Sequence, residues 1–124
     1  MSQDKVSDAL NEIMNAKKAK KESLKIEGKT TKLLIKILEI MKKSGYISYK
    51  LKDRVVEIEL VELDTCRAIK PRFNVNVEGI EKYRRRFLPA RDFGYLIIST
   101  NKGLMTHQEA QEKNVGGNLI AYVF

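Results

Sequence analysis

A polar segment that follows an apolar run near the C-terminus constrains the fold more than any other part of the chain. Residues 95–98 read Tyr-Leu-Ile-Ile, an apolar and β-branched run that predicts a buried strand. Three short polar side chains follow at Ser99, Thr100 and Asn101, and then Lys102 and Gly103. The strand is therefore expected to end in a compact loop that is rich in hydrogen-bonding groups.

A short helix is expected after this loop. Thr106 and Glu109 have the spacing of a capping box, which predicts a helix over about 107–113. Asn114 suits the end of that helix, because Asn tolerates the left-handed backbone conformation that a helix C-terminus often needs.

Two adjacent glycines, Gly116 and Gly117, then lead into a final apolar strand expected over 119–124. Glycine lets backbone approach backbone, or lets a ligand approach backbone. Together with the polar loop and Lys102, the glycines would offer a surface suited to phosphate, sugar and exposed base edges. A plain turn at 101–103 and a flexible Gly-Gly linker explain the same residues without a ligand.

Beyond these local patterns, the motifs resemble a known family. The run Ser-Thr-Asn-Lys-Gly-Leu-Met-Thr at 99–106, Glu-Ala at 109–110 and Val-Gly-Gly at 115–117 resemble the C-terminal signature of the ribosomal small-subunit protein eight family. The family also ends its chains on an aromatic residue, as this chain does at Phe124. Further stretches, which resemble the archaeal and eukaryotic branch, are 69–73, 86–94, 8–11 and 13–16. The resemblance covers nearly the whole chain.

The length of 124 residues allows one domain or two small lobes, and 43% apolar residues suffice for a core. The predicted fold class is α+β, with an N-terminal α-β-α-β-β lobe (1–64) packed on a mainly β C-terminal lobe with short helices (65–124). The N-terminal elements are expected at 4–18, 23–27, 30–43, 46–49 and 54–61, with a hydrophilic turn at 50–53. The relatives carry a longer turn there. The C-terminal lobe should add a strand at 68–77, which Pro71 confines to an edge or a bulge.

The arginines 84–86 are placed on the outer side of a short helix at 78–87. An irregular link follows at 88–94, either a contact surface for protein or RNA or a loop pinned by Leu88 and Phe93.

Positive charge is concentrated in the first part of the chain. The net charge is +8, and residues 1–52 hold 13 Lys and Arg against 6 Asp and Glu, whereas residues 53–124 hold 11 against 10. This pattern is typical of polyanion binding, although a soluble basic surface is the common alternative.

Asn11 and Asn15 are four residues apart and share one face of the first helix, and Lys17 and Lys18 lie near its end. The family resemblance implies that this segment contacts the minor groove and phosphates of RNA. A solvated helix end is the alternative for the lysines.

Catalysis has little support in the sequence. The only histidine, His107, lies in a helix turn, and Cys66 has no Cys or His neighbour, so a half-buried structural thiol is expected. The carboxylates Glu57 and Glu59, with Glu62, raise the alternative of a metal-dependent nuclease, but they follow the normal period of a polar strand face. We therefore expect no enzyme, no cofactor and no metal. No apolar run is long enough to span a membrane.

The resemblance implies a structural component of the small ribosomal subunit that binds the central domain of its rRNA. The expected RNA-binding residues are Ser99, Thr100, Asn101, Lys102, Gly103, Gly116, Gly117, Asn11, Asn15, Lys17 and Lys18. The family usually has Ser where Asn101 stands. Neighbouring ribosomal proteins are the other expected partners. The free protein is expected to be a monomer, and its expected location is the ribosome in the cytoplasm. The resemblance also implies feedback binding to its own mRNA. The alternative is a general RNA-binding or protein-interaction adaptor outside the ribosome.

Overall fold

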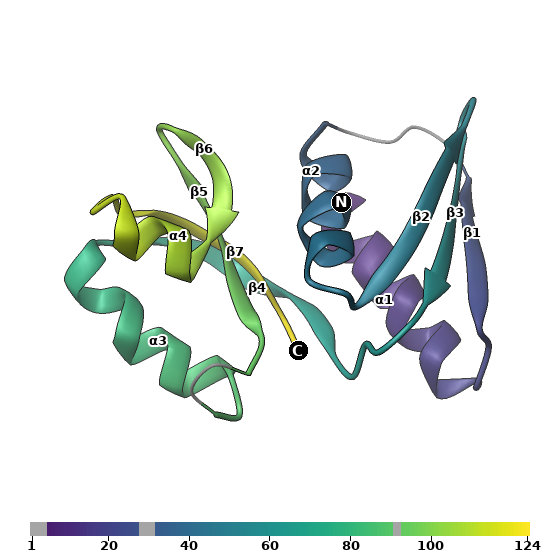
Figure 1. The fold of residues 1–124 in the computed structure, drawn as a ribbon, viewed down its shortest axis with the longest axis horizontal. Coiled ribbons are helices and arrows are strands. Elements are labelled where there is room, and N and C mark those ends of the chain that lie inside the picture. The colour runs from purple at the N-terminus through teal and green to yellow at the C-terminus, as the bar shows by residue number, and fades with distance from the viewer. Residues whose placement is uncertain (1–4, 28–31, 91–92) are drawn as a thin grey trace. The chain divides into compact units, whose positions relative to one another are not determined.

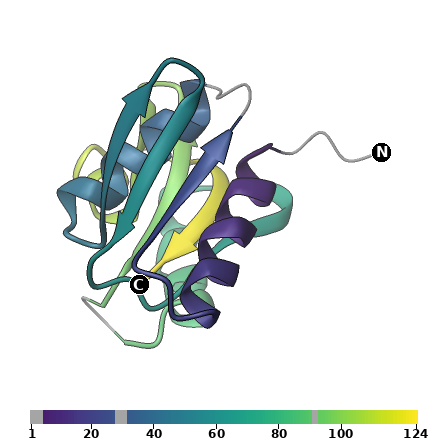
Figure 2. The same cartoon turned by 90° about the vertical axis from the view of Figure 1, so that its right-hand side faces the viewer.

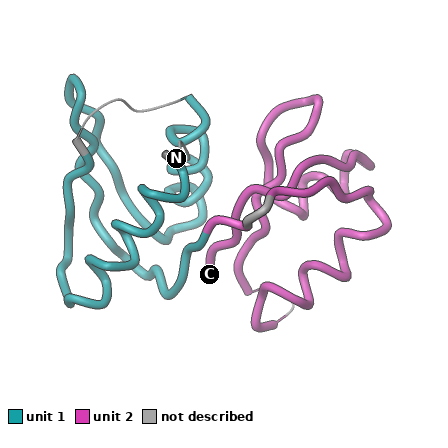
Figure 3. The backbone as a smooth tube through the Cα atoms, turned by 180° about the vertical axis from the view of Figure 1, so that it is seen from behind, with its two compact units in different colours: residues 1–67 teal, residues 68–124 magenta. Residues whose placement is uncertain are grey.

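The protein folds as two compact units, residues 1–67 and 68–124 (Figure 3). The computed structural model describes residues 5–27, 32–90 and 93–124. Each unit combines helices with one β-sheet, which confirms the predicted α+β class. The sequence placed the seam between residues 64 and 65, and the functions assigned to the two lobes stay predictions.

The first unit is a three-stranded sheet covered by two helices on one face (Figures 1 and 2). Its strands are antiparallel, in the order β1-β3-β2, so β1 is an edge strand as predicted. The elements are α1 (Lys5–Lys18), β1 (Ser23–Glu27), α2 (Lys32–Lys43), β2 (Ile47–Lys52) and β3 (Val55–Leu60).

The core of the first unit follows from helical periodicity. The predicted stripe of α1 is buried along its whole length, at Val6, Ala9, Leu10, Ile13 and Met14. The buried residues of α2 are Leu34, Ile37, Leu38 and Met41. The last three of these are fully excluded from solvent. Val56 and Ile58 of the central strand complete this core. The prediction that Thr30 or Thr31 caps α2 lies outside the described residues.

The β2–β3 hairpin has a shorter turn than we expected. Lys50 and Lys52 pair with Glu57 and Val55 and so belong to β2, which leaves only Asp53 and Arg54 in the turn. Asp53 has a φ of 50°, a left-handed conformation that Asp tolerates better than most residues. Polar composition suggested a loop at 50–53, but cross-strand pairing extends the strand through it.

The second unit is a four-stranded sheet in the order β4-β7-β5-β6, with two short helices (Figure 1). Pro71 lies in β4, an edge strand, as expected. The elements are β4 (Cys66–Val75), the 3-10 helix η1 (Val77–Gly79), α3 (Ile80–Phe87), β5 (Tyr95–Thr100), β6 (Gly103–Thr106), α4 (His107–Glu112) and β7 (Gly117–Val123). β4 begins in the first unit and continues into the second.

The second core is formed by one face of this sheet and both helices. Ile80 of α3 and Ala110 of α4 are fully buried, and the sheet adds Leu96, Ile98 and Leu119. This packing places α3 and α4 on the same face of the sheet. Side chains alternate along a strand, so Tyr95, Ile97 and Ser99 of β5 lie on the opposite face of the sheet.

One local prediction was wrong in this unit, and one strand was not predicted. Val77 begins η1 instead of ending β4, since the Asn76 side chain accepts a hydrogen bond from the backbone N–H of Gly79 and starts the turn there. The segment 103–106 forms strand β6, which hydrophobic periodicity did not indicate because only four residues are involved. None of the helices in the described ranges is long and apolar enough to cross a membrane.

Candidate nucleic-acid interface

The polar signature residues lie at the end of the β5–β6 hairpin. Ser99 and Thr100 are the last residues of β5, and Gly103 pairs with Thr100 at the start of β6. Asn101 and Lys102 form the two-residue turn and are exposed. Gly103 has a φ of 114°, a conformation that favours glycine, so a side chain here would strain the turn. The hairpin therefore projects an amide and an ammonium group into solvent.

The hydroxyl of Thr100 holds this turn together. Its Oγ1 donates to the carbonyl oxygen of Gly103 at 2.8 Å and accepts from the backbone N–H of Lys102 at 3.1 Å. A hydroxyl has one donor and two acceptor positions, so one acceptor position remains for a ligand. Thr100 can thus accept a hydrogen bond from a base or a ribose hydroxyl while it still shapes the turn.

The glycine pair is explained by close backbone packing. A Cβ at Gly117 would overlap the carbonyl oxygen of Ser99, and a Cβ at Gly116 would lie 2.8 Å from the Cα atom of Asn76. Gly117 therefore lets β7 approach the end of β5, next to the polar turn. The alternative of a flexible linker is wrong for Gly117, which is part of β7.

Asn118 is a polar neighbour of this site that the sequence interpretation missed. It stands opposite Ser99 in the β5–β7 pair, and Leu104 stands opposite Ser99 in the β5–β6 pair. Directly opposed residues share a sheet face, so Asn118 and Ser99 present an amide and a hydroxyl side by side. The position of Asn118 beside Ser99 follows from the pairing of β7 with β5, and no sequence pattern within 115–124 indicates this position.

Helix α4 begins as its capping box predicts. The Thr106 side chain accepts from the backbone N–H of Glu109 at 3.3 Å, and its hydroxyl lies 3.3 Å from the carboxylate of Glu109. Asn114 has a φ of 55°, which confirms its role at the helix end. His107 is buried, and its Nδ1 accepts the backbone N–H of Leu96 at 3.1 Å, so this histidine has a structural role in joining α4 to β5.

On helix α1 the predicted residues occupy two different faces. Asn11, Asn15 and Lys18 follow one another at four and three residues, so they lie in one line along the helix, and all three are exposed. Asn15 also lines a groove of about 540 Å³ between α1 and β1, whose charged lining residues are Lys21, Lys25 and Glu12. The exposed line of Asn11, Asn15 and Lys18 is available to a ligand.

Lys17 lies on a different face of α1, in line with the buried Leu10 and Met14. Its ammonium donates to the carbonyl oxygen of Leu63 at 2.6 Å and to the carboxylate of Asp64 at 3.1 Å. Two of its three N–H donors are therefore already engaged within the protein.

The arginine run of α3 is divided between the interior and the surface. Arg84 is only 8% exposed, which corrects the expectation that all three arginines point outward, while Arg85 and Arg86 are exposed. Nε of Arg84 donates to Glu81 at 2.7 Å. This hydrogen bond, more than the second one from Gln111, lowers the pKa of Glu81, although burial opposes the shift.

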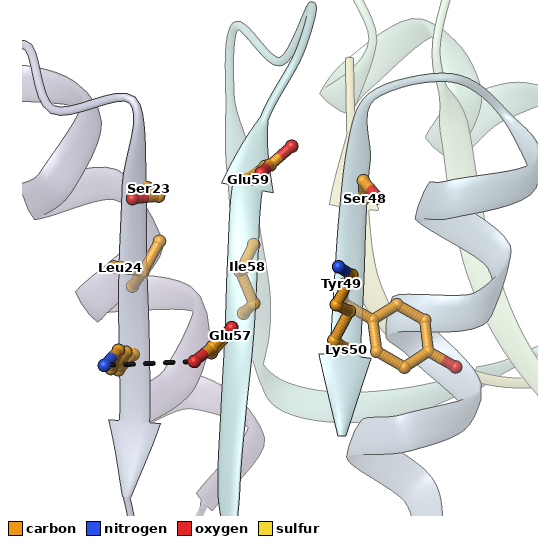
Figure 4. Close-up of a pocket in the computed structure, with 9 residues that line it drawn as sticks. Ser23, Leu24, Ser48, Tyr49, Lys50, Glu57, Ile58 and Glu59 are labelled. Atoms are coloured by element: carbon orange, nitrogen blue, oxygen red, sulfur yellow. Dashed lines mark ion pairs between the residues drawn. The ribbon is translucent and has the colours of Figure 1, made fainter. Parts of the chain in front are cut away.

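The carboxylates proposed for a nuclease lie on the open face of the first sheet (Figure 4). Glu57 is 3.8 Å from the ammonium groups of both Lys25 and Lys52, and Glu59 lies between Ser23 and Ser48, beside a shallow hollow of about 280 Å³. Glu57 is thus an ion-pair partner on a polar strand face. Among the residues that the structure describes, no cluster of His, Cys, Asp and Glu is arranged to hold a metal ion.

Cys66 is more buried than predicted, at 1% exposure instead of half-buried. Burial raises the pKa of its thiol to about 12, so little reactive thiolate is present near neutral pH. This environment is typical of a structural cysteine.

Comparison with known proteins places this geometry in a family. The family model described as Ribosomal protein S8 matches residues 4–124. Small ribosomal subunit protein uS8 of Nanoarchaeum equitans is 46% identical over 135 residues, which cover all of both chains. Small ribosomal subunit protein uS8A of Saccharomyces cerevisiae is 40% identical over 126 residues, covering 96% of this chain and 95% of the yeast protein. The archaeal and eukaryotic affinity that the sequence indicated is therefore confirmed, and the chain belongs to the ribosomal protein S8 family.

Proposed function

We propose that this protein is a structural, non-enzymatic constituent of the small ribosomal subunit, and that it binds the central domain of the small-subunit rRNA as a primary assembly protein. Membership of the S8 family over residues 4–124 carries this proposal. The relatives in Nanoarchaeum equitans and Saccharomyces cerevisiae are named as small ribosomal subunit proteins.

The hairpin tip is the element that we expect to read RNA structure. Ser99, Asn101 and the remaining acceptor position of Thr100 can hydrogen-bond bases and ribose hydroxyls of an irregular RNA helix. Gly103 leaves open space at the hairpin tip, and Gly116 and Gly117 let the chain pack closely against Asn76 and Ser99. Such contacts depend on shape and therefore favour a specific RNA fold over a regular duplex.

Lysines supply the general attraction for RNA. Lys102 at the hairpin tip and Lys18 at the end of α1 are exposed and suited to phosphate, and Asn11 and Asn15 are suited to ribose and base edges of a minor groove. Lys17 can add one further contact at most while its bonds to Leu63 and Asp64 persist.

The proposal also concerns partners and location. We propose neighbouring ribosomal proteins as its other partners and the cytoplasmic ribosome as its location. We also propose a monomeric free state and feedback binding to the protein's own mRNA, and membership of the family supports these proposals. The alternative, an RNA-binding or protein-interaction adaptor outside the ribosome, would make the same basic surface serve other partners.

Salt-titrated binding to two RNAs tests the proposal. One RNA is a hairpin from the central domain of small-subunit rRNA, and the other is a regular duplex of equal length. We expect tighter binding to the hairpin, with a preference that survives raised salt, because specific hydrogen bonds are screened less than phosphate contacts. Equal affinities that both collapse with salt would reject specific rRNA recognition and favour the adaptor.

A further inference from the structure

One stripe of helix α1 holds the segment that leads into strand β4. Leu10, Met14 and Lys17 are spaced by four and three residues and therefore lie in line on the helix. The carbonyl oxygen of Leu10 is 3.8 Å from the thiol of Cys66, and the sulfur of Met14 is 3.3 Å from the backbone N–H of Cys66. Lys17 reaches Leu63 and Asp64. The connector, residues 63–66, is thus attached to α1 at three successive positions.

Lys17 makes the shortest of these contacts. Residues 61–65 form no helix or strand, so the carbonyl oxygen of Leu63 is not part of a β-ladder or helical hydrogen-bond pattern. The Lys17 ammonium donates a hydrogen bond to this oxygen at 2.6 Å. Lys17 is 37% exposed, whereas its carboxylate partner Asp64 is 65% exposed. The hydrogen bond to the partly buried carbonyl should therefore matter more than the exposed ion pair.

Lys18 differs from Lys17 in one decisive respect. It is exposed and lies in line with Asn11 and Asn15, away from the connector. The two adjacent lysines have the same charge and helix propensity but face different surroundings, which makes each a control for the other.

We propose that Lys17 is a positioning residue that fastens the connector 63–66 to helix α1, and that Lys18 makes the phosphate contacts at this end of the helix. The second half of this inference rests on the proposed RNA-binding function, whereas the first half does not.

Alkylation of Cys66 by iodoacetamide in the native, full-length protein tests the first half without RNA. The thiol is buried against α1, so reagent reaches it when the connector opens. Lys17→Met should raise the labelling rate about fivefold to tenfold, the change expected from losing a charged hydrogen bond. Asp64→Asn keeps the bond to Leu63 and should raise it about twofold or less, and Lys18→Met should leave it unchanged.

The salt dependence of RNA binding tests the second half. Each phosphate contact contributes about 0.7–0.9 to the slope of log affinity against log salt. Lys18→Met should lower the slope by about that amount, and Lys17→Met should change it little. An unchanged labelling rate in Lys17→Met would overturn the inference. So would a salt slope that falls as much in Lys17→Met as in Lys18→Met. If Lys17→Met does not fold, Lys17→Ala is labelled in its place. A labelling rate in Lys17→Ala equal to that of wild type overturns the first half, and an unchanged slope in Lys18→Met overturns the second. If the wild-type protein binds no RNA, the proposed function fails while the labelling result still decides the role of Lys17.

Discussion

Gly117 has no room for a side chain, because the carbonyl oxygen of Ser99 occupies the position that its Cβ would take. The two residues lie on neighbouring strands, where Ser99 pairs with Asn118. The conspicuous glycine of the C-terminal signature is thus required by the packing of β7 against β5, at the point where β5 turns into the polar hairpin.

Gly117→Ala should destabilise the protein by about 2 kcal/mol, because an added methyl group at the start of β7 must displace the backbone of β5 at Ser99. Urea unfolding followed by circular dichroism measures this. Gln108→Ala, at an exposed position of α4, serves as the control and should stay within about 0.5 kcal/mol of wild type. A stability equal to wild type in Gly117→Ala would show that the strands move apart without cost.

Thr100→Val should weaken binding to the cognate rRNA hairpin more than binding to a regular duplex. The substitution keeps the shape of the side chain but removes the hydroxyl that holds the turn and that we expect to contact RNA. A loss of about tenfold, or 1.4 kcal/mol, is the order expected for one such hydrogen bond.

Thr100→Ser retains the hydroxyl and should bind the hairpin almost like wild type. Equal losses on hairpin and duplex for Thr100→Val would remove Thr100 from the specific contact. Unfolding curves of both variants separate a damaged turn from a lost RNA contact.

Tyr49→Phe removes a hydrogen bond whose contribution to the free energy of unfolding should disappear at high pH. The hydroxyl of Tyr49 donates to Glu39 at 2.6 Å, and this bond, with burial and the charge of Glu39, raises the pKa of Tyr49 to about 12. The folded protein therefore holds this proton more tightly than the unfolded chain, whose pKa is about 10. The bond stabilises fully below pH 10 and its contribution is lost between pH 10 and 12.

The difference in unfolding free energy between wild type and Tyr49→Phe should accordingly be about 1 kcal/mol at pH 8 and shrink as the pH rises towards 12. Tyr122→Phe, in the second unit, is the comparison for removal of a tyrosine hydroxyl as such. A difference that stays constant to pH 12 would contradict the assignment.

Arg84→Met should cost about 1 kcal/mol of stability, because the hydrogen bond from Arg84 Nε to Glu81 at 2.7 Å is lost. The Glu81 side chain is 43% exposed, so water replaces part of that bond and limits the cost. Arg85→Met, at the exposed neighbouring position, should be nearly neutral. The lowered pKa of Glu81 means that the interaction is present above about pH 4.5 and is lost as the pH falls through the folded-state pKa.

The stability difference between Arg84→Met and wild type should therefore narrow in acid. Thermal unfolding at pH 7 and at pH 3 measures it. A cost that is equal at both pH values would place the contribution of Arg84 in its packing and not in its bond to Glu81.

The sequence by itself determined the elements whose evidence is local. The stripe from Val6 to Met14, the capping box of Thr106 and Glu109, and the left-handed Asn114 all depend on residues within one or two helical turns, and each is found as predicted. The family resemblance rests equally on contiguous motifs. Periodicity and capping are properties of neighbours along the chain, which is why they can be read without a structure.

Tertiary structure decided which of those residues are free to act. Lys17 and Lys18 are equivalent in the sequence, as are Arg84 and Arg85, yet Lys17 is bonded to Leu63 and Arg84 is buried beside Glu81. The short strand β6 and the place of Asn118 beside Ser99 likewise depend on strand pairing. Partners distant in the chain set hydrogen bonding and burial, so the role of a charged or polar side chain follows from the packing around it and not from its own type.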